Sequence, residues 1–585
     1  MSWTKLPKGG FTGIDWAKPD ATNGFDPYLV WAEADRFAGY GDKQPKWLPV
    51  AIELSPGTSI AHFISVASPQ WLHVPPVYTS SAAPVGLRYC TARVRPAFFK
   101  HIQPGGSLHA LVKRLELGLP AGPHAEGPDA SSAAGTKPPL KGKVMAVIDD
   151  GLAFANANFL RNGKARTRYF WRQDGKGVGH TPAGLGYGHE LMAADINHAM
   201  QQRTYNGLVD EGAVYQHFKL TALQKPVSHG THVLDLACGP RTLLAQVADL
   251  PPGFDGPASW APADDDASRC DIIAVQLDYD TVADTSGGSM NVSVMDGLMY
   301  ILSRCAQDAK VVANISFGTL AGPHDGSSLL EAAMDQLVTL CGQRLQIVLA
   351  AGNSYQLRTH ANLTLSKNER ATLHWRGQPD DLTENFLELW LPPQAHGIKI
   401  EITPPGRAAL PALGFGQSGM WTDGGTQPLC ALIYPKSAAT GTNGTCALIA
   451  VAPTFSFDKG TATAPSGVWQ IKLTNTQPSH VTIDAYVERD DVVIGSRGGR
   501  QSHFEDKLYD MSGDPGSFVD DPNNQSLIRR SGNFNSIATG QNTVSVGGTR
   551  IVGPRWAHYS PQKPDPDAGR PERPGVVKVP DAAAF

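Results

Sequence analysis

The sequence predicts an α/β protein with a doubly wound parallel sheet, an N-terminal α+β unit and an inserted antiparallel β-sandwich. Between Lys141 and Tyr355, short apolar strand segments alternate with amphipathic helical segments, the pattern of a parallel sheet covered on both faces. After Tyr355 come short strands separated by turn-rich segments, with no evident helix, which is typical of an antiparallel sandwich. The α/β pattern then resumes with "SIATGQNTVSVGGTRIVG".

The N-terminal part divides into three stretches. Residues 1–43 are polar and aromatic without clear periodicity. In residues 44–119, "WLPVAIEL" and "LRYCTARV" predict strands, and "GGSLHALVKRLELG" predicts a helix end followed by a strand. Residues 120–140 are rich in Pro, Gly, Ala and Ser and almost without large apolar side chains, so we expect a flexible, cleavable linker.

The α/β domain is expected in two parts, 141–356 and 491–585, on either side of the sandwich at 357–490. In its first part, "KVMAVIDDG", "DIIAVQLDY", "KVVANISFG" and "LQIVLAAGN" predict strands. The stretches "NVSVMDGLMYILSRCAQ" and "SSLLEAAMDQLVTLCG" predict helices.

Composition restricts the classes of function. The net charge of −4 gives no reason to expect nucleic acid or an anionic membrane as a partner. No apolar run reaches bilayer length, and "MSWTKLPKGGFTGIDWAKPD" lacks the apolar core of a signal peptide. The seven cysteines are scattered without a CxxC pair, which predicts reduced thiols in a cytoplasmic protein; a Cys430–Cys446 bridge is the alternative.

Three polar residues stand where strands end or a helix begins, which is where parallel sheets carry their reactive groups. Asp149 closes "VMAVI", His229 follows Ser228 at the mouth of a helix, and Asn353 closes "LQIVLAAG". An acid, an imidazole and an amide at converging ends suit acyl transfer: the acid orients the imidazole, the imidazole takes a proton from a nucleophile, and the amide donates to the oxyanion.

The stretches "AVIDDG", "SHGTHV", "NISFG" and "AAGN" resemble, in order and approximate spacing, the Asp, His, substrate-binding and oxyanion blocks of subtilisin-like serine peptidases (subtilases, peptidase S8 family). The resemblance covers roughly 141–355 and 531–585, whereas HGTH or AAGN alone would be a weak signal. It implies Asp149 as the orienting acid, His229 as the general base and Asn353 as the oxyanion donor. It also implies that Ser316, Phe317 and Gly318 lie on the strand that pairs with the substrate backbone, with no organic cofactor.

Each residue also has a structural interpretation. His232 is expected to pack or hydrogen-bond within its helix, and a zinc site is disfavoured because the HExxH spacing and a third ligand are missing. Asp149 is alternatively a strand-end cap, and Asp150 is the rival orienting acid. Asn353 is alternatively a turn cap, and Ser316 and Phe317 ordinary strand residues. The acidic run Asp264–Asp266 predicts a solvated loop, with calcium binding as the alternative.

The N-terminal α+β unit has the size and position of a subtilase propeptide, so the resemblance implies a propeptide-like domain at 44–119 whose last strand leads toward the active site. The alternative is an unrelated accessory domain. A long excursion between Asp149 and His229 is similar to excursions in some bacterial subtilases, and we assign it no chemistry.

The Gly-Thr-Ser-x-Ala block that a subtilase needs is not in the sequence. Ser536 in "GNFNSIATG" is the tempting substitute, but this stretch resembles the segment that precedes the nucleophile, so we expect Ser536 away from His229. Three explanations stay open: a truncated enzyme, a serine on a separate segment or chain, or a degenerate relative that binds peptides. The expectation is a serine endopeptidase acting on polypeptides; a catalytically dead peptide-binding module is the alternative.

Overall fold

The computed structural model describes residues 1–38, 45–118, 139–175, 177–224, 228–240, 265–436, 443–490, 498–509, 525–548 and 582–584. All but two residues of the linker predicted at 120–140 lie outside the described residues, as does Asp264 of the acidic run.

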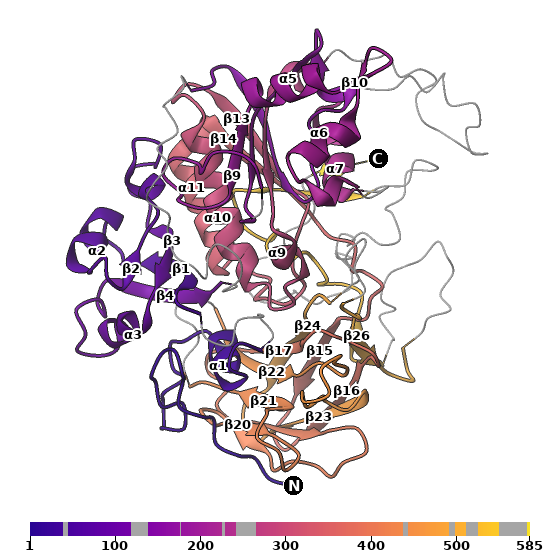
Figure 1. Ribbon diagram of the computed structural model, residues 1–585. Helices are drawn as coiled ribbons and strands as arrows, with labels where there is room; N and C mark the ends of the chain where they lie inside the picture. Colours follow the sequence, from indigo (N-terminus) through magenta and orange to yellow (C-terminus); the bar gives the residue numbers. More distant parts are fainter. Residues whose placement is uncertain are drawn as a thin grey trace.

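An eight-stranded sheet forms the centre of the molecule, in the order β28-β27-β14-β13-β5-β12-β8-β9 (Figure 1). Every neighbouring pair is parallel except β8 and β9, which are antiparallel. The strands are β5 (Lys143–Asp149), β8 (Thr167–Arg172), β9 (His189–Met192), β12 (Asp271–Gln276), β13 (Lys310–Ile315), β14 (Leu345–Ala350), β27 (Val544–Gly548) and β28 (Ala582–Ala584). The parallel sheet expected from the alternating pattern is therefore present.

Helices cover both faces of this sheet, because successive side chains of each strand point to opposite faces. In β5, Val147 packs in a cluster with Phe170 and Leu234, whereas Ile148 packs in the other cluster with Met295. The first face carries α5 (Ala193–Gln202), α6 (Glu211–His217) and α7 (His229–Cys238); the second carries α10 (Gly288–Ser303) and α11 (Leu329–Cys341).

A four-stranded antiparallel sheet, ordered β2-β3-β1-β4, lies beside α10 and α11. Its elements are β1 (Leu48–Leu54), α2 (Ile60–Val66), β2 (Leu72–His73), β3 (Tyr89–Val94), α3 (Pro96–Ile102) and β4 (Val112–Leu117). The helix end expected just before β4 is a turn instead: Gly105 has φ +84°, and a Cβ at Gly106 would collide with the backbone of His101.

A buried carboxylate joins this α+β unit to the central domain. Asp296 of α10 accepts hydrogen bonds from Tyr78 (2.9 Å), Thr91 (2.6 Å) and Tyr187 (2.8 Å), and Arg93 lies 3.8 Å from it. A buried, desolvated carboxylate is tolerated only when it is paired and hydrogen-bonded in this way. The contact therefore fixes the α+β unit on the face of the sheet that carries α10 and α11.

The chain segment that connects β14 to β27 forms two antiparallel sheets that pack face to face, in the lower part of Figure 1. One is ordered β20-β21-β22-β17-β24-β15-β26 and the other β19-β18-β23-β16-β25. Their strands are β15 (His360–Leu365), β16 (Arg370–Gly377), β17 (Asn385–Leu391), β18 (Ile398–Thr403), β19 (Leu413–Gly414), β20 (Ser418–Trp421), β21 (Cys430–Ile433), β22 (Thr445–Val451), β23 (Gly467–Asn475), β24 (Val481–Val487), β25 (His503–Glu505) and β26 (Ile528–Arg529). In the α/β domain, the connections between the central strands contain further short elements: α8 (Asp266–Arg269), α9 (Tyr279–Ala283), β6 (Leu160–Arg161), β7 (Lys164–Ala165), β10 (Thr204–Tyr205) and β11 (Leu208–Val209).

The N-terminal segment forms a helix, α1 (Pro27–Ala34), that the sequence pattern did not indicate. Two of its side chains reach the sandwich: the buried Trp31 indole donates to Glu384 and the half-buried Tyr28 hydroxyl to Glu388, both at 2.8 Å. Burial on nearly all sides explains the missing periodicity, because a helix without a solvent face shows no amphipathic pattern.

The seven cysteines are free, so the alternative of a Cys430–Cys446 bridge is wrong for this structure. In the sheet, Cys430 faces Val451 and Cys446 faces Trp390 across neighbouring strands. No helix in the described part of the chain is both long and apolar enough to cross a bilayer.

Candidate active site

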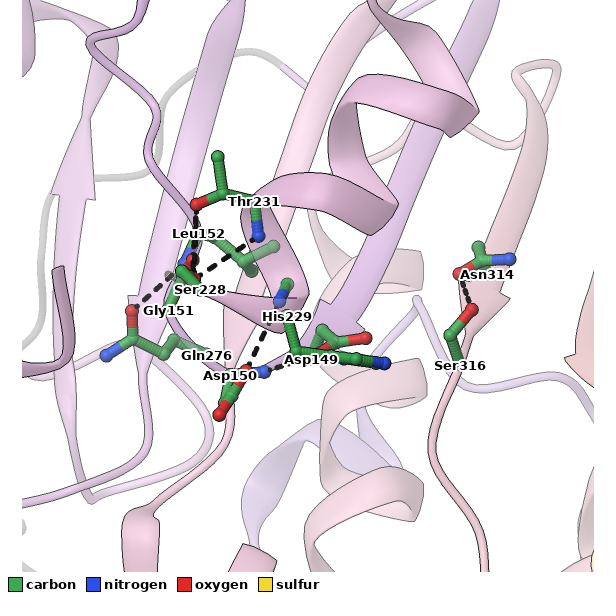
Figure 2. A network of polar contacts seen from close by, with 11 residues as sticks. Asp149, Asp150, Gly151, Leu152, Ser228, His229, Thr231, Gln276, Asn314 and Ser316 are labelled. Carbon is green, nitrogen blue, oxygen red and sulfur yellow. Dashed lines mark hydrogen bonds and ion pairs between the residues drawn. The ribbon is translucent and has the colours of Figure 1, made fainter. Parts of the chain in front are cut away.

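Asp149 and His229 meet where β5 ends and α7 begins (Figure 2). The apolar run before Asp149 places it as the last residue of the central strand, with its side chain completely buried. Ser228 caps α7 by accepting the N–H of Thr231, so His229 is the first helical residue. Gly230 is required there, since a Cβ would collide with the carbonyl oxygen of Asp150.

The imidazole of His229 is oriented by Asp149. Its Nδ1 lies 2.7 Å from Asp149 Oδ1, and the same oxygen accepts the backbone N–H of Asp150 at 2.8 Å. This contact assigns the Nδ1–H tautomer, which leaves Nε2 as a proton acceptor. The His229 side chain is 41% exposed, and within the described residues Nε2 makes no hydrogen bond.

The pair has shifted proton affinities. The hydrogen bond to Asp149 raises the pKa of His229 above its ordinary value near 6.5, although desolvation opposes the shift. Burial raises the pKa of Asp149, and the hydrogen bond from His229 opposes that rise. The two groups therefore form a coupled acid–imidazole unit with one ring nitrogen facing outward.

Polar contacts fix the helix start against the strand end (Figure 2). Thr231 Oγ1 donates to the carbonyl of Gly151 at 2.6 Å and accepts the N–H of Ala153 at 3.1 Å. Asp150 accepts the N–H of Gly230 at 3.2 Å. Asp150 thus holds the helix backbone, whereas Asp149 holds the imidazole.

The segment Ser316–Gly318 follows β13, and one of its side chains faces His229. The Phe317 ring stands at 89° to the imidazole with centroids 6.3 Å apart. Ser316 Oγ donates to Asn314 Oδ1 at 2.9 Å. The structure therefore places Phe317 beside the acid–imidazole pair. The Ser316 hydroxyl points back toward Asn314 of its own strand (Figure 2).

Asn353 lies three residues past the end of β14 and is exposed, with no side-chain hydrogen bond among the described residues. Its loop is fixed by neighbours: Ser354 Oγ donates to the carbonyl of Asn533 at 2.7 Å, and the Asn535 N–H donates to the carbonyl of Ala351 at 2.8 Å. The amide is thus carried on an anchored loop and makes no hydrogen bond to the residues that the structure describes.

Ser536 lies in a turn and is buried. Its Oγ is 2.5 Å from Thr319 Oγ1, and its N–H donates to the Thr319 carbonyl at 3.0 Å. The hydroxyl is therefore engaged by Thr319 and not by His229.

Two residues that the sequence did not single out complete this side of the site. The Asn535 amide donates to the carbonyls of Phe317 (3.3 Å) and Ala350 (3.0 Å), which bridges the ends of β13 and β14. Arg489, just past β24 of the sandwich, places its guanidinium carbon 4.3 Å from the Phe317 ring centroid. The only sequence signal at this point is the charged run "ERDD", where the sandwich returns to the α/β domain.

The described residues bring together one group of three candidate metal ligands, Asp149, Asp150 and His229, whose ligand atoms lie within 4.8 Å of one another. Three ligands fall one short of a closed zinc site. Moreover, Asp149 Oδ1 and His229 Nδ1 face each other in a hydrogen bond, and Asp150 is used by Gly230. The arrangement fits a hydrogen-bonded acid–imidazole pair better than a metal centre.

The eight-stranded sheet with helices on both faces defines an α/β protein. Among solved structures, the chain is similar to that of the Clostridium perfringens CspB protease, with a TM-score of 0.50 and 18% identity over 76% of each chain. At this identity the likeness shows the fold alone. Similarity to the Bacillus licheniformis lipase BlEst2 in propeptide form is much weaker (TM-score 0.15, 7% identity, 34% of this chain and 58% of that chain) and carries no argument. No protein-family model and no curated protein sequence matches the chain.

Proposed function

We propose that the protein is a subtilisin-like serine endopeptidase in which Asp149 and His229 form the acid–base part of the active site. The observation that carries this proposal is the 2.7 Å contact between His229 Nδ1 and buried Asp149 Oδ1 in a protease-like fold, with Nε2 facing outward. No other pair in the described chain combines a buried carboxylate at a central strand end with a half-exposed histidine at a helix start.

The chemistry follows from the tautomer. His229 Nε2 accepts the proton of a serine hydroxyl as the serine oxygen attacks the scissile carbonyl carbon. The negative charge on the carbonyl oxygen is stabilised by the Asn353 amide, and Asp149 stabilises the imidazolium. The proton then passes to the leaving amine as the C–N bond breaks. A water molecule, deprotonated by the same nitrogen, hydrolyses the acyl-enzyme.

The nucleophilic serine is proposed to be absent from residues 1–585 and to be carried by a separate segment or chain. Two observations support this assignment: the Ser316 hydroxyl is held by Asn314 and the Ser536 hydroxyl by Thr319. The same observations favour the second candidate, a catalytically dead relative that binds polypeptides beside Phe317.

The other assignments belong to the same proposal. The α+β unit at 44–119 is the protein's own propeptide, the linker at 120–140 is its cleavage point, and the sandwich is an insert of the catalytic domain. Free, mostly buried thiols support action in the cytoplasm.

The test is hydrolysis of a quenched fluorescent peptide library by the full-length protein, with His229→Ala compared against His232→Ala. In subtilisin, loss of the base lowers kcat by roughly 10⁶, a value taken from that enzyme. We expect a loss of this order for His229→Ala and near-normal rates for His232→Ala. Equal rates in both variants would exclude the proposed mechanism, and peptide binding without turnover would favour the second candidate.

A further inference from the structure

Two buried carboxylates lie where one strand of the sandwich begins and its neighbour ends. Asp381 stands just before β17 and Asp490 just after β24, and these two strands pair antiparallel. The two residues are 0% and 3% exposed, and none of the ion pairs in the described part of the chain includes either of them. Because two buried like charges repel each other and are costly to desolvate, a proton or a cation must neutralise part of their charge.

One hydroxyl joins the two carboxylates. Thr383 Oγ1 lies 2.8 Å from Asp381 Oδ1 and 2.7 Å from Asp490 Oδ1. A hydroxyl carries a single proton, so it donates to only one of these two oxygens. The second contact therefore needs either a proton on one carboxyl group or a cation that holds the oxygens together.

Two further oxygens at this point have no hydrogen-bond partner within the described residues. They are Asp490 Oδ2 and the Oδ1 of Asn385, a side chain that is 2% exposed. Asn385 belongs to the same cluster, because its Nδ2 donates to Asp381 Oδ2 at 2.7 Å. A proton at the Thr383 contact would explain that contact but leave both of these oxygens without a partner. A cation explains both observations, since it binds several oxygens at once.

The backbone around these side chains approaches them closely. The Leu382 N–H donates to the carbonyl of Gly498 at 3.0 Å, which holds the turn of Asp381 against the segment of Gly498. A Cβ at Gly499 would collide with Asp490 Oδ1, so the carboxylate has its space only because this residue is glycine. The cluster is therefore enclosed by fixed main chain.

The cluster also lies at the junction between the sandwich and the α/β domain. Glu488, two residues before Asp490, accepts the N–H groups of Leu320 (3.0 Å) and Ala321 (2.9 Å) from the segment that follows β13. An ion held by Asp490 would therefore strengthen the point at which the end of β24 is attached to the α/β domain.

We propose that Asp381, Asp490 and Asn385 bind a calcium ion at this junction. All three offer hard oxygen ligands, which suit Ca²⁺ or Mg²⁺ and not the softer transition metals. Mg²⁺ usually keeps several water molecules, whereas these side chains are at most 3% exposed, so Ca²⁺ with its protein-rich coordination fits better. The two carboxylates balance the charge of the ion, and the Thr383 hydroxyl, main-chain carbonyls and water are sources of further ligands. The inference does not depend on the proposed peptidase activity.

The experiment measures the melting temperature of the full-length protein after treatment with EGTA, without and with added CaCl₂. Two carboxylate ligands correspond to weak calcium sites, with a Kd of roughly 10⁻⁴–10⁻³ M. At about 10 mM calcium, binding should lower the unfolding equilibrium constant by about 10- to 100-fold, which raises the melting temperature by about 3–8 °C. The same concentration of MgCl₂ should give a smaller rise.

Asp490→Asn distinguishes a cation from a shared proton. Without calcium this variant removes one of two like charges and should be at least as stable as the unmodified protein. Its gain in melting temperature from calcium should fall to about half or less, because the loss of ligand charge weakens binding by at least about tenfold. Asp381→Asn should show a similarly reduced gain, so the inference stays testable if one variant does not fold.

The matched control is Asp458→Asn, in an exposed turn of the sandwich where the carboxylate accepts the Gly460 N–H at 2.9 Å. This variant should keep the full response to calcium. Isothermal titration calorimetry of the same proteins should show one calcium ion fewer in Asp490→Asn than in the unmodified protein. An equal response to calcium in the unmodified protein, Asp490→Asn and Asp381→Asn would show that the ion binds elsewhere and would overturn the inference. No response to calcium in the unmodified protein would overturn it in favour of the shared proton.

Discussion

The two sides of the candidate active site are built differently. At the end of β5, Asp149 and His229 come from two short motifs, and the contacts that hold them are to residues next to those motifs. At the ends of β13 and β14, the holding residues lie far along the chain: Asn535 bonds Phe317 and the end of β14, and Glu488 bonds the backbone just beyond Gly318. Thus contacts within the two motifs fix the side chains of the first side, whereas the second side depends on the assembly of the whole domain.

The largest effect is expected on the first side. Asp149→Asn removes the charge that fixes the Nδ1–H tautomer, and the equivalent change in a serine protease of another fold lowers kcat by about 10⁴. We expect a similar loss in peptide hydrolysis. Asp150→Asn is the matched control: among the described residues the Asp150 carboxylate accepts a hydrogen bond only from the Gly230 N–H, so the rate should change by less than about tenfold.

On the second side, Asn353→Ala tests the oxyanion role. Removal of such a donor lowers kcat by roughly 10²–10³ in subtilisin, with little change in KM. The control is Asn368→Ala, an exposed turn residue of the sandwich with φ +63°. If both variants hydrolyse peptides at the same rate, Asn353 is only a loop residue.

Two glycines compare the rigidity of the two sides. A Cβ at Gly230 would collide with the backbone of Asp150, whereas a Cβ at Gly318 would collide with the side chain of Asn535. Backbone cannot move aside as a side chain can, so Gly230→Ala should lower the free energy of unfolding by about 3 kcal/mol. Gly318→Ala should cost about 1–2 kcal/mol, because Asn535 can turn away at the expense of its hydrogen bonds.

Chemical denaturation monitored by tryptophan fluorescence measures both. Gly10→Ala is a suitable control, since nothing lies within 4 Å of the added carbon. A larger loss of stability for Gly318→Ala than for Gly230→Ala would show that the second side is the more rigid of the two.

The pH dependence gives the smallest effect. The reaction needs neutral His229, so kcat/KM should rise with pH as the imidazole loses its proton. Because Asp149 raises the pKa of His229, the midpoint of this rise should lie above 6.5, and Asp149→Asn should move it down in whatever activity remains. A midpoint that does not move between the two proteins would contradict the coupling.

The difference between local and long-range contacts also explains which features the sequence predicts and which it does not. The alternating pattern indicated the parallel sheet, and strand ends indicated Asp149 and His229, since a strand and a capped helix are local structures. Helix α1 was missed because it is buried on nearly all sides. Arg489 and Asn535 were missed because their place beside Phe317 follows from how the sandwich and the last strands pack, which no local pattern encodes.

The central claim is that His229, oriented by Asp149, activates a serine. The most direct measurement is labelling of the full-length protein with a fluorophosphonate probe, followed by mass spectrometry to locate the modified residue. We predict no labelled serine in residues 1–585 alone and one labelled serine on the segment or chain that supplies the nucleophile, with labelling abolished by His229→Ala and retained in His232→Ala. Labelling of Ser536, or labelling that does not depend on His229, would contradict the account.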